Sequence, residues 1–573
     1  MGRTLLRNAE LAERFELLAD LLELDGADAF RLLAYRRAAA RIRESAVPVA
    51  QLALERKATR LSGIGSTIEK KIVELTETGD LQALAKLRGR IPPGLVDVMH
   101  VPGLGPKTAR KLWDELGVAS AADLRAAAEQ SRLRAVPGLG VKTEQRVLAY
   151  FESAAKTSAS SGRALLGQVL PHVRSVVEEL RADPAADRVS EAGSVRRRTE
   201  TVRDLDMIAT ASDPAALIDH FTSLTWIAEV VAKGGTKATV VSHDGHRFDL
   251  RVVPPECYGS LLQHFTGSKE HNVALREDAV RRGLSVSEYG VEAVATGEVV
   301  TMATEEELYA YLGYAWIPPE LRENAGELEA ARARSLPVLV ERVDVRGDLH
   351  SHTDWSDGKA TLEEMVAAAQ ARGHFYLAIC DHAKRLKNGR LERQAEAIAE
   401  LNAELGDFRV LSGVEVDIRA DGSLDLDDEA LAARDWVVAS IHAGFRDPSE
   451  EVTRRVLAAI ESPHVDCIGH LTGRKIGRRA PCDLDLAAIF ARAAETGTFL
   501  EVNGQPDRLD LRDANARAAA EAGVRIVLSS DAHSQSGLDF LELAVAQARR
   551  GWLTAVDVVN TRPWDEIRGM INP

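Results

Sequence analysis

Cysteine is scarce in this chain. Cys257, Cys380, Cys467 and Cys482 are the only four among 573 residues, and they stand far apart without a C-x-x-C spacing. Such scattered cysteines argue against a disulfide framework and against a cysteine-based zinc knuckle. They fit a reducing compartment, so we expect the protein in the cytoplasm.

Long apolar runs are also missing. No stretch approaches the roughly 18 apolar residues needed to span a membrane. Residues 1–20 carry charges throughout and contain no apolar signal core. With 45% hydrophobic and 28% charged residues, the composition is that of a soluble globular protein. We therefore expect no membrane partner.

An overall excess of positive charge, common in proteins that bind nucleic acid, is absent. The net charge is -15, but it is unevenly distributed. Residues 1–150 contain 24 basic and 19 acidic side chains, whereas residues 341–573 contain 28 and 40. An acidic C-terminal part thus hides a mildly basic N-terminal part, and the total charge does not exclude nucleic acid.

A glycine-containing pattern occurs three times in the first 150 residues. The copies are LSGIGSTIEKKI (61–72), VPGLGPKTARKL (101–112) and VPGLGVKTEQRV (136–147). The two glycines permit a tight hairpin. The helix that follows begins with free backbone N–H groups, which can hold a phosphate. The pattern resembles the helix-hairpin-helix motif, which binds the DNA backbone without reading sequence; the alternative is a plain packing unit. The positions expected at DNA are Gly63, Gly65, Gly103, Gly105, Lys107, Thr108, Gly138, Gly140 and Lys142.

A change from helical to strand-like periodicity occurs near residue 187 and brings acidic residues together. RVSEAGSV, DLDMIATA, ATVVSHDG and RFDLRVVP are rich in β-branched residues and alternate with helical patterns, which predicts an α/β or α+β domain. Asp204 and Asp206 would share one face of a strand, and Asp249 on another strand would complete a carboxylate site for two magnesium ions. Gly193 allows a close backbone approach, Ser194 offers a hydroxyl, and Arg197 offers a bidentate donor for a triphosphate.

Strands alternate with alanine-rich helices from residue 343 to the end, which predicts a parallel (β/α) barrel. Polar residues occur at the C-terminal ends of these strands, where barrel enzymes place their active sites. Imidazole and carboxylate together suit zinc, manganese or iron. The candidate ligands are His350, His352, Asp357, His382, Glu415, His442, His470, Asp531 and His533.

The string G-S-x-R-R followed seven residues later by D-x-D resembles the signature of family X DNA polymerases, and the histidine set resembles the PHP phosphoesterase family. The resemblance covers nearly the whole chain. It implies a multidomain protein with helical helix-hairpin-helix domains, an α/β nucleotidyltransferase palm with a thumb, and a C-terminal PHP barrel. The implied limits are 1–95 (lyase-like domain), 96–155 (fingers-like domain), 156–256 (palm), 257–315 (thumb), 316–340 (linker) and 341–573 (PHP domain).

The same resemblance implies further binding residues. HFTGSKEHNVALRED (264–278) would place Phe265 and Gly267 by the nucleotide sugar, Asn272 at the base and Arg276 at the template. His264 stands where the family usually has tyrosine, which puts sugar discrimination in question. Lys71 falls on a Schiff-base lysine of animal polymerase beta; it would form that adduct, bind a 5′-phosphate, or be a solvated lysine.

The leading interpretation is a monomeric repair polymerase that fills gaps. Its PHP domain would act as a 3′-5′ exonuclease, an AP endonuclease or a 3′-phosphoesterase. Its ligands would be gapped or nicked double-stranded DNA, dNTPs, Mg²⁺ or Mn²⁺ at the palm, and up to three Mn²⁺, Zn²⁺ or Fe²⁺ ions at the barrel. One alternative is a PHP phosphatase whose N-terminal half only anchors it to DNA, and another is a scaffold for DNA ends without activity.

Overall fold

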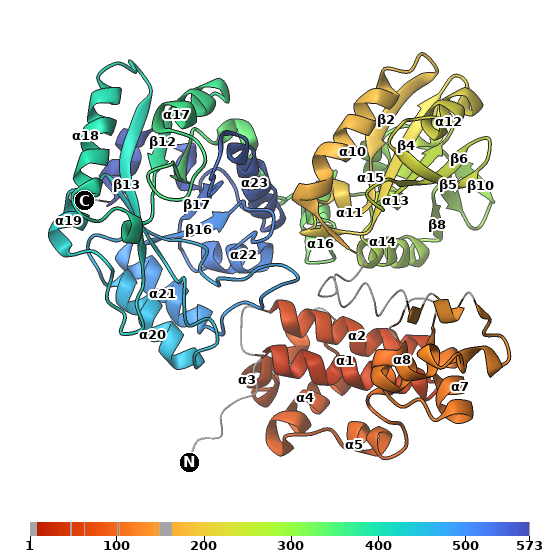
Figure 1. Ribbon diagram of the computed structural model, residues 1–573. Helices are drawn as coiled ribbons and strands as arrows, with labels where there is room; N and C mark the ends of the chain where they lie inside the picture. The colour runs from red at the N-terminus through yellow and green to blue at the C-terminus, as the bar shows by residue number, and fades with distance from the viewer. Residues whose placement is uncertain are drawn as a thin grey trace. The chain divides into compact units, whose positions relative to one another are not determined.

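The computed structural model describes residues 8–45, 49–61, 63–99, 101, 104–141, 143–145, 147–148 and 163–571 (Figure 1). The chain divides into two compact units, Met1–Ser160 and Ser161–Pro573. Gly103 and Lys142, both expected at DNA, lie outside the described residues. Within the described ranges, every helix is too short or too polar to cross a membrane.

The first unit is helical, and apolar residues at helical spacing build its core. Leu11, Phe15, Leu18 and Leu22 form one stripe of α1 and are buried. This stripe belongs to a core shared by the helices of the unit. The elements are α1 Asn8–Leu24, α2 Ala29–Glu44, α3 Val49–Leu54, η1 Ala58–Arg60, α4 Ser66–Thr78, α5 Gln82–Arg88, α6 Leu95–Met99, α7 Pro106–Leu116, α8 Ala121–Glu129 and η2 Leu133–Ala135.

The second unit begins with the palm, a five-stranded sheet in the order β2-β4-β7-β6-β5. β4 and β7 are parallel, and the other neighbours are antiparallel. The strands are β2 Ala186–Glu191, β4 Asp204–Ala211, β5 Ile227–Lys233, β6 Lys237–Ser242 and β7 Arg247–Val252. The helices α10 Leu166–Arg181, α11 Gly193–Arg196 and α12 Pro214–Thr222 accompany them, together with the short pair β1 Ala164–Leu165 and β3 Thr201–Val202.

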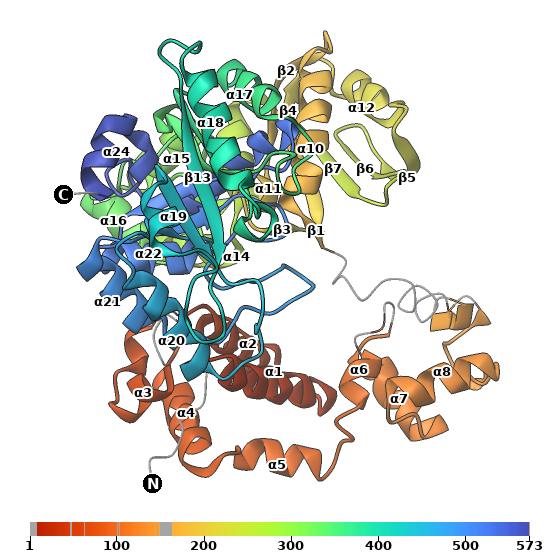
Figure 2. The same cartoon turned by 60° about the vertical axis from the view of Figure 1, so that its left-hand side comes forward.

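Side chains alternate along β4 and β7, so the palm sheet has a core face and a site face. Figure 2 shows the ribbon of these strands together with α10 and α12. Leu205, Met207 and Phe248 point into the hydrophobic core that α10 and α12 share with the sheet. The residues between them, including Asp206 and Asp249, therefore point to the opposite face. The strand predictions that placed the carboxylates are confirmed by the bounds of β2, β4, β6 and β7.

The thumb follows the palm and extends through the segment expected to be a linker. Residues 316–340 contain two helices and bury Ile317 and Leu321 in the thumb core. Arg322 is fully buried and donates to Glu305, so charges that suggested a linker are used inside the domain. The thumb elements are η3 Pro255–Cys257, α13 Tyr258–Thr266, α14 Lys269–Arg281, β8 Leu284–Ser287, β9 Gly290–Ala293, β10 Glu298–Val300, α15 Glu305–Tyr311, η4 Pro319–Leu321 and α16 Glu327–Ala333.

The last domain is the predicted parallel barrel, with seven strands paired in chain order. The strands are β11 Gly347–Ser351, β12 Tyr376–Ile379, β13 Arg409–Asp417, β14 Trp436–Ser440, β15 Cys467–Ile468, β16 Phe499–Asn503 and β17 Ile526–Ser529. The main helices are α17 Leu362–Ala371, α18 Arg390–Asn402, α19 Asp428–Ala432, α20 Ser449–Ile460, α21 Leu486–Thr496, α22 Asp513–Glu521, α23 Leu541–Arg550 and α24 Trp564–Ile571. Short turns η5 Arg342–Asp344, η6 Ala383–Arg385, η7 Gln535–Phe540 and η8 Val559–Thr561 complete it.

A buried asparagine joins the first and last strands of this barrel. The Asn560 amide group donates to the carbonyls of Gly347 (2.8 Å) and Leu528 (2.7 Å). Its oxygen accepts from the Leu528 N–H at 3.0 Å. Ser351 of β11 forms a parallel bridge with Ala532, which follows the end of β17. The barrel is thus nearly closed, and backbone groups that two edge strands would leave unpaired have partners.

The palm and the barrel share one hydrophobic core and several ion pairs. Leu509 and Leu543 of the barrel belong to the same buried cluster as the residues of α10. Arg474 donates to Glu200 at 3.1 Å, and Arg174 donates to Glu542 at 2.7 Å. These contacts hold the palm and the barrel together as one body.

Candidate active sites

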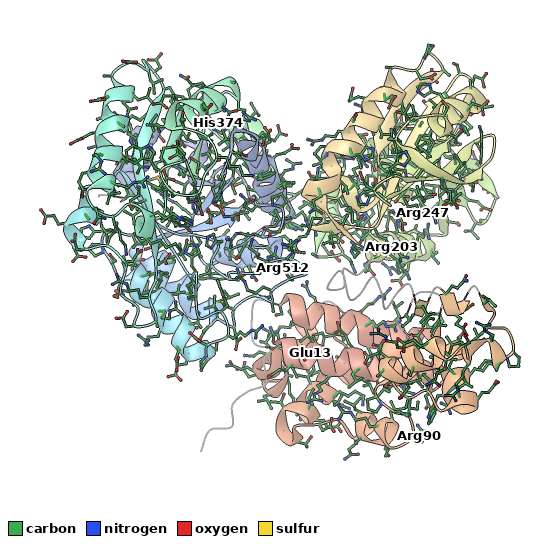
Figure 3. All side chains as sticks on the ribbon, viewed as in Figure 1. Glu13, Arg90, Arg203, Arg247, His374 and Arg512 are labelled. Atoms are coloured by element: carbon green, nitrogen blue, oxygen red, sulfur yellow. The ribbon has the colours of Figure 1, made fainter. Side chains whose placement is uncertain are left out.

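The palm carboxylates gather on the site face of the sheet. Asp206 on β4 is the direct neighbour of Asp249 on β7, and Asp204 precedes Asp206 by two residues on the same strand. All three side chains therefore point to the same side. Arg247 is the register partner of Asp204 and lies on the same face of the sheet as Asp249, whereas Arg203 directly precedes β4; Figure 3 labels both arginines.

Neighbouring residues make room for one of these carboxylates and hydrogen-bond to another. Gly193 leaves room for Asp206, because a Cβ at Gly193 would come within 2.4 Å of an Asp206 oxygen. Asp249 accepts from Arg247 at 3.0 Å and from the Thr239 hydroxyl. Glycine at position 193 is therefore required by the acid behind it as well as by a backbone φ of +60°.

The electrostatics of the palm site fit a divalent cation. Burial, followed by the charges of Asp249 and Asp204, raises the pKa of Asp206 from 3.8 to about 6. A carboxylate in this setting is stabilised when a cation sits between it and its neighbours. Hard oxygen donors of this kind suit Mg²⁺ or Mn²⁺. The three aspartates are thus suited to hold the ions expected at this site.

The arginines of the G-S-x-R-R string reach the thumb. Arg196 donates twice to Glu305, at 2.8 Å each. Arg197 donates to Glu323 at 3.0 Å and to the Thr266 carbonyl. Arg197, expected at a triphosphate, therefore already has protein partners next to Gly267, where an added Cβ would lie 3.1 Å from its guanidinium. For Ser194 the structure shows a backbone carbonyl that accepts from Thr199.

The remaining nucleotide-site candidates form a connected group at the junction of α13 and α14. Asn272 donates to the His264 carbonyl at 2.7 Å, and its oxygen accepts from Gln263 at 2.8 Å. Arg276 lies 2.7 Å from His264 Nδ1. Burial, with Arg276 next in effect, lowers the pKa of His264, so the ring is neutral near pH 7. It thus accepts a hydrogen bond from the arginine expected at the template.

Phe265 faces Arg251, whose guanidinium lies 4.4 Å from the ring centroid. Arg251 also lowers the pKa of Asp206, against the larger effects of burial and of the neighbouring acids. It links Phe265, which we expected at the nucleotide sugar, to the carboxylates. The sequence pattern contains a signal for it that we did not use, because Arg251 follows Asp249 by two residues and so shares its face.

The helix-hairpin-helix candidates of the first unit divide into two kinds. Gly63 and Gly138 have φ values of +86° and +89° and occupy the left-handed region. Gly65 and Gly105 precede α4 and α7 with extended backbone, and an added Cβ at either, or at Gly140, would meet no atom within 4 Å. Lys107 is exposed at the start of α7, whereas Thr108 and Lys71 are partly buried. The hairpin geometry thus leaves the helix starts open to a phosphate.

The barrel candidates gather at the C-terminal ends of the strands, and three groups have ligand atoms within 4.8 Å of one another. The groups are His352, Asp357, His382 and His533; His350, His352 and Asp531; and His382, Glu415 and His442. His470 joins the third group, with Nε2 3.1 Å from a Glu415 oxygen. The structure therefore brings together all nine candidate ligands.

The barrel cluster also fits metal ions. Nε2 of His350 and Nδ1 of His470 are buried without a hydrogen-bond partner among the described residues. Burial lowers the pKa of His382, but Asp357 and Glu415 outweigh it and raise the value to about 10. Burial, followed by Arg508, lowers the pKa of His470 to about 4. Imidazoles facing buried carboxylates in this way are typical of a centre that exchanges protons for cations when it is loaded.

Three acidic residues that sequence reasoning missed orient this cluster. Glu501 lies 2.7 Å from His350 Nδ1, and Asp417 lies 2.7 Å from His442 Nδ1. Asp381 accepts from the Thr353 N–H at 2.8 Å and thereby holds the loop that carries Asp357. Carboxylates in such positions fix the ring orientation and tautomer of a ligating histidine. Asp417 ends β13, as several ligands end their strands, and this position is the signal that could have found it; Glu501 lies in the middle of β16.

Family models match four parts of the chain. A helix-hairpin-helix domain matches residues 6–81, and a SAM-like helix-hairpin-helix tandem matches residues 95–152. A DNA polymerase beta thumb matches residues 261–323, and a PHP domain matches residues 348–505. Together with the palm carboxylates and the barrel cluster, they define a nucleotidyltransferase of the polymerase beta type joined to a PHP metal-dependent hydrolase.

Curated relatives identify the family. The chain is 39% identical over 570 residues to the DNA polymerase/3′-5′ exonuclease PolX of Bacillus subtilis (strain 168), which covers 98% of this chain and 99% of that protein. The chain belongs to this PolX family. It is also 24% identical over 344 residues to DNA polymerase lambda of Rattus norvegicus, which covers 55% of this chain and 56% of that protein. A probable phosphatase of Thermoanaerobacter sp. (strain X514) is 29% identical over 226 residues, 37% of this chain and 89% of the phosphatase.

Proposed function

We propose that the chain is a DNA-directed DNA polymerase that fills gaps during repair and removes nucleotides from 3′ ends with its PHP barrel. The observation that carries this proposal is the presence of two separate cation-binding constellations on one chain of the PolX family. Each constellation combines ligands suited to phosphoryl transfer.

At the palm, Asp204, Asp206 and Asp249 would hold two Mg²⁺ or Mn²⁺ ions, which would supply charge stabilisation at the reacting phosphate. The primer 3′ oxygen attacks the α-phosphorus of a dNTP, and pyrophosphate leaves. Gly193 and Ser194 would approach the triphosphate, which Arg197 would bind after exchanging its Glu323 contact for phosphate oxygens. Phe265 and Gly267 would face the sugar, Asn272 the base and Arg276 the template strand.

At the barrel, the nine ligands would hold up to three Mn²⁺, Zn²⁺ or Fe²⁺ ions, which would activate water and neutralise phosphate charge. Glu501 and Asp417 keep His350 and His442 in the tautomers that present Nε2 to the centre. The substrates we propose are phosphodiesters at 3′ ends and at abasic sites, and 3′-phosphate monoesters.

DNA would be held by the helix-hairpin-helix segments of the first unit. The free N–H groups at the starts of α4 and α7, with Lys107, would bind backbone phosphates of gapped or nicked duplexes. Lys71, which is partly buried on α4, would contact a 5′-phosphate at a gap. We further propose that the protein acts as a monomer in the cytoplasm, associated with the nucleoid.

Separating the two activities tests the proposal. Asp206→Ala should abolish nucleotide addition to a one-nucleotide-gapped duplex while leaving metal-dependent degradation of a 3′-mismatched primer. His350→Ala combined with His352→Ala should do the reverse. Both activities are followed by gel electrophoresis of end-labelled primers. Primer extension by Asp206→Ala would refute the assignment of the polymerising site.

A phosphatase is the second candidate, because probable phosphatases match part of this chain over 89% and 78% of their own length. In that case the wild-type protein would release phosphate from small monoesters and would neither extend nor shorten a primer. Steady-state assays on 4-nitrophenyl phosphate and on the labelled primer distinguish the two candidates.

A further inference from the structure

A pocket of about 290 Å³ opens beside the barrel cluster, and Asp531 and His533 form part of its wall. The rest of its lining includes Lys475, Gln505, Arg508 and Phe540. We infer that this pocket binds the unpaired 3′-terminal nucleotide of a DNA strand, with its phosphate toward the metal ligands and its base against Phe540. The inference rests on the proposed hydrolysis of 3′ ends and adds the site that recognises the substrate.

Two cationic side chains in the lining can bind the phosphate. Arg508 Nε lies 3.7 Å from Asp531, so its guanidinium stands at the edge of the metal cluster. Lys475 is held by Asp507, with 2.8 Å between Nζ and the carboxylate. An ammonium group has three donors, and one contact with Asp507 leaves two for phosphate oxygens. Both cations thus lie where the phosphate attached to a bound nucleotide would be.

The base would meet a flat apolar surface. The Phe540 ring is partly buried against the hydrophobic core that the palm and barrel share, which fixes its position. Stacking on an aromatic ring accepts any base. Gln505 is also held, because its side chain donates to the Asp531 carbonyl. The pocket is thus held in place on two sides, and its aromatic wall provides a stacking surface for any base.

The size of the pocket limits what enters it. Ligand pockets range from about 300 to about 1,000 Å³, and a volume of about 290 Å³ is just below this range. The pocket therefore has room for about one nucleotide. A base pair presents two bases and two backbones, so the terminal base must be unpaired before it enters. A mismatched or frayed 3′ end meets this condition.

A basic hairpin next to the pocket provides a path for the rest of the strand. Lys475 and Arg479 pair as an antiparallel bridge, and Arg478 is exposed at the turn between them. Arg474 ties the base of the hairpin to Glu200 of the palm. Residues 473–482 contain four basic and no acidic side chains, within a domain that is acidic overall. Such a cluster is suited to backbone phosphates.

The proposed reaction is hydrolysis of the terminal phosphodiester bond of the strand. Water attacks the phosphorus that joins the last two nucleotides, and the bond from phosphorus to the 3′ oxygen of the penultimate nucleotide breaks. That oxygen takes up a proton and becomes the new 3′-hydroxyl. The pocket releases a deoxynucleoside 5′-monophosphate, and the shortened strand moves forward by one residue.

Crosslinking locates the terminal nucleotide. A single-stranded oligonucleotide with 4-thiothymidine only at its 3′ end is irradiated with the full-length protein in EDTA, and the crosslinked peptides are identified by mass spectrometry. We expect adducts within residues 505–508 or 533–540. Adducts confined to the palm or to the first unit would overturn the inference.

Kinetics on charge and stacking variants provide a second test. Lys475→Ala and Arg478→Ala should each lower the slope of log KM against log salt concentration by about 0.7 for single-stranded DNA. Phe540→Leu should reduce kcat/KM for the oligonucleotide, relative to that for bis(4-nitrophenyl) phosphate, by about tenfold. Phe540→Tyr, which keeps the ring, should restore this ratio.

Arg409→Ala is the matched control, because Arg409 is an exposed cation at the start of β13, at the other end of the barrel. Wild-type protein that hydrolyses neither the diester nor the oligonucleotide would refute the proposed barrel activity itself. Wild-type protein that hydrolyses both, together with pocket variants that behave like Arg409→Ala, would refute only the nucleotide pocket.

Discussion

Asp206 shows at the scale of one residue how the palm site is prepared for a cation. Its pKa of about 6 exceeds the usual 3.8 because of burial and two neighbouring acids. The unfolded chain releases this proton near pH 3.8, whereas the folded chain keeps it until about pH 6. The folded state therefore binds more protons between these values, and stability falls as the pH rises through this window.

Asp206→Asn removes this penalty. In EDTA at pH 7.5 the variant should be more stable to unfolding than the wild type by about 1–2 kcal/mol, a shift discounted for partial exposure. Near pH 4 the two proteins should be equally stable. Adding Mg²⁺ should stabilise the wild type more than the variant, because only the wild type keeps the full ligand set of the palm. Thermal unfolding with and without Mg²⁺ measures this, and equal stabilisation by Mg²⁺ would contradict the assignment of Asp206 as a ligand.

Residue types and spacing could predict which side chains meet, but not the partners they have in the folded protein. The Asp-x-Asp pair and the nine barrel candidates follow from period-two strands and from the rule that barrel sites lie at strand ends. The contact of Arg197 with Glu323 could not be predicted, because these residues are 126 positions apart and meet only when the thumb packs. Glu501 escaped notice for a similar reason, since its role depends on His350 lying beside it.

At the scale of elements, different glycines of the hairpins in the first unit serve folding and DNA binding. Gly138 requires a left-handed backbone, so Gly138→Ser should cost about 1 kcal/mol of stability. Gly105 caps α7 with extended backbone in open space, and serine is a good helix cap. Gly105→Ser should therefore fold normally while placing a side chain where a phosphate would approach.

DNA binding should be affected more by Gly105→Ser than by Gly138→Ser. Gly105→Ser should lower the salt-dependence slope for gapped DNA by about 1, the effect of losing one phosphate contact. Fluorescence anisotropy over a series of salt concentrations, paired with thermal unfolding, measures both effects. Unchanged DNA binding by Gly105→Ser would show that this helix start does not contact the backbone.

Element types were more predictable than element roles. Alternation in the palm and alternating strands and helices in the barrel predicted the α/β sheet and the (β/α) barrel, and both are confirmed. Residues 316–340 differ from the expected linker, because proline and mixed charge signal loops only when the charges face water. Here Arg322 is buried against Glu305 of the preceding helix, a pairing visible only in three dimensions.

At the scale of the molecule, Arg550 connects the barrel to the polymerising half. It is a buried side chain of α23 that donates to Asp513 and Glu323 at 3.0 Å each and to the Arg197 carbonyl at 2.9 Å. Burial opposes its charge, but Asp513 and Glu323 outweigh burial and raise its pKa. The same arginine therefore supports both Glu323 and the backbone of the residue proposed to bind triphosphate.

Arg550→Met should destabilise the second unit by about 1–3 kcal/mol, because it removes one partner from the half-buried carboxylates Asp513 and Glu323. It should also raise the KM for dNTPs, although Arg550 belongs to the barrel domain. Calorimetric unfolding and gap-filling kinetics measure the two effects, with the exposed Arg525→Met as control. Normal dNTP kinetics in a folded Arg550→Met protein would show that the barrel does not support the nucleotide site.

The hydrophobic core that α10 shares with Leu509 and Leu543 limits how DNA can pass between the two reaction centres. A tether would let one domain swing toward the other, but interlocked side chains fix the spacing between palm and barrel. The 3′ end of the primer must then move from the palm to the barrel. To do so it separates from its template and crosses a distance that the protein keeps constant. The rate of proofreading would then depend on how readily the end of the duplex frays.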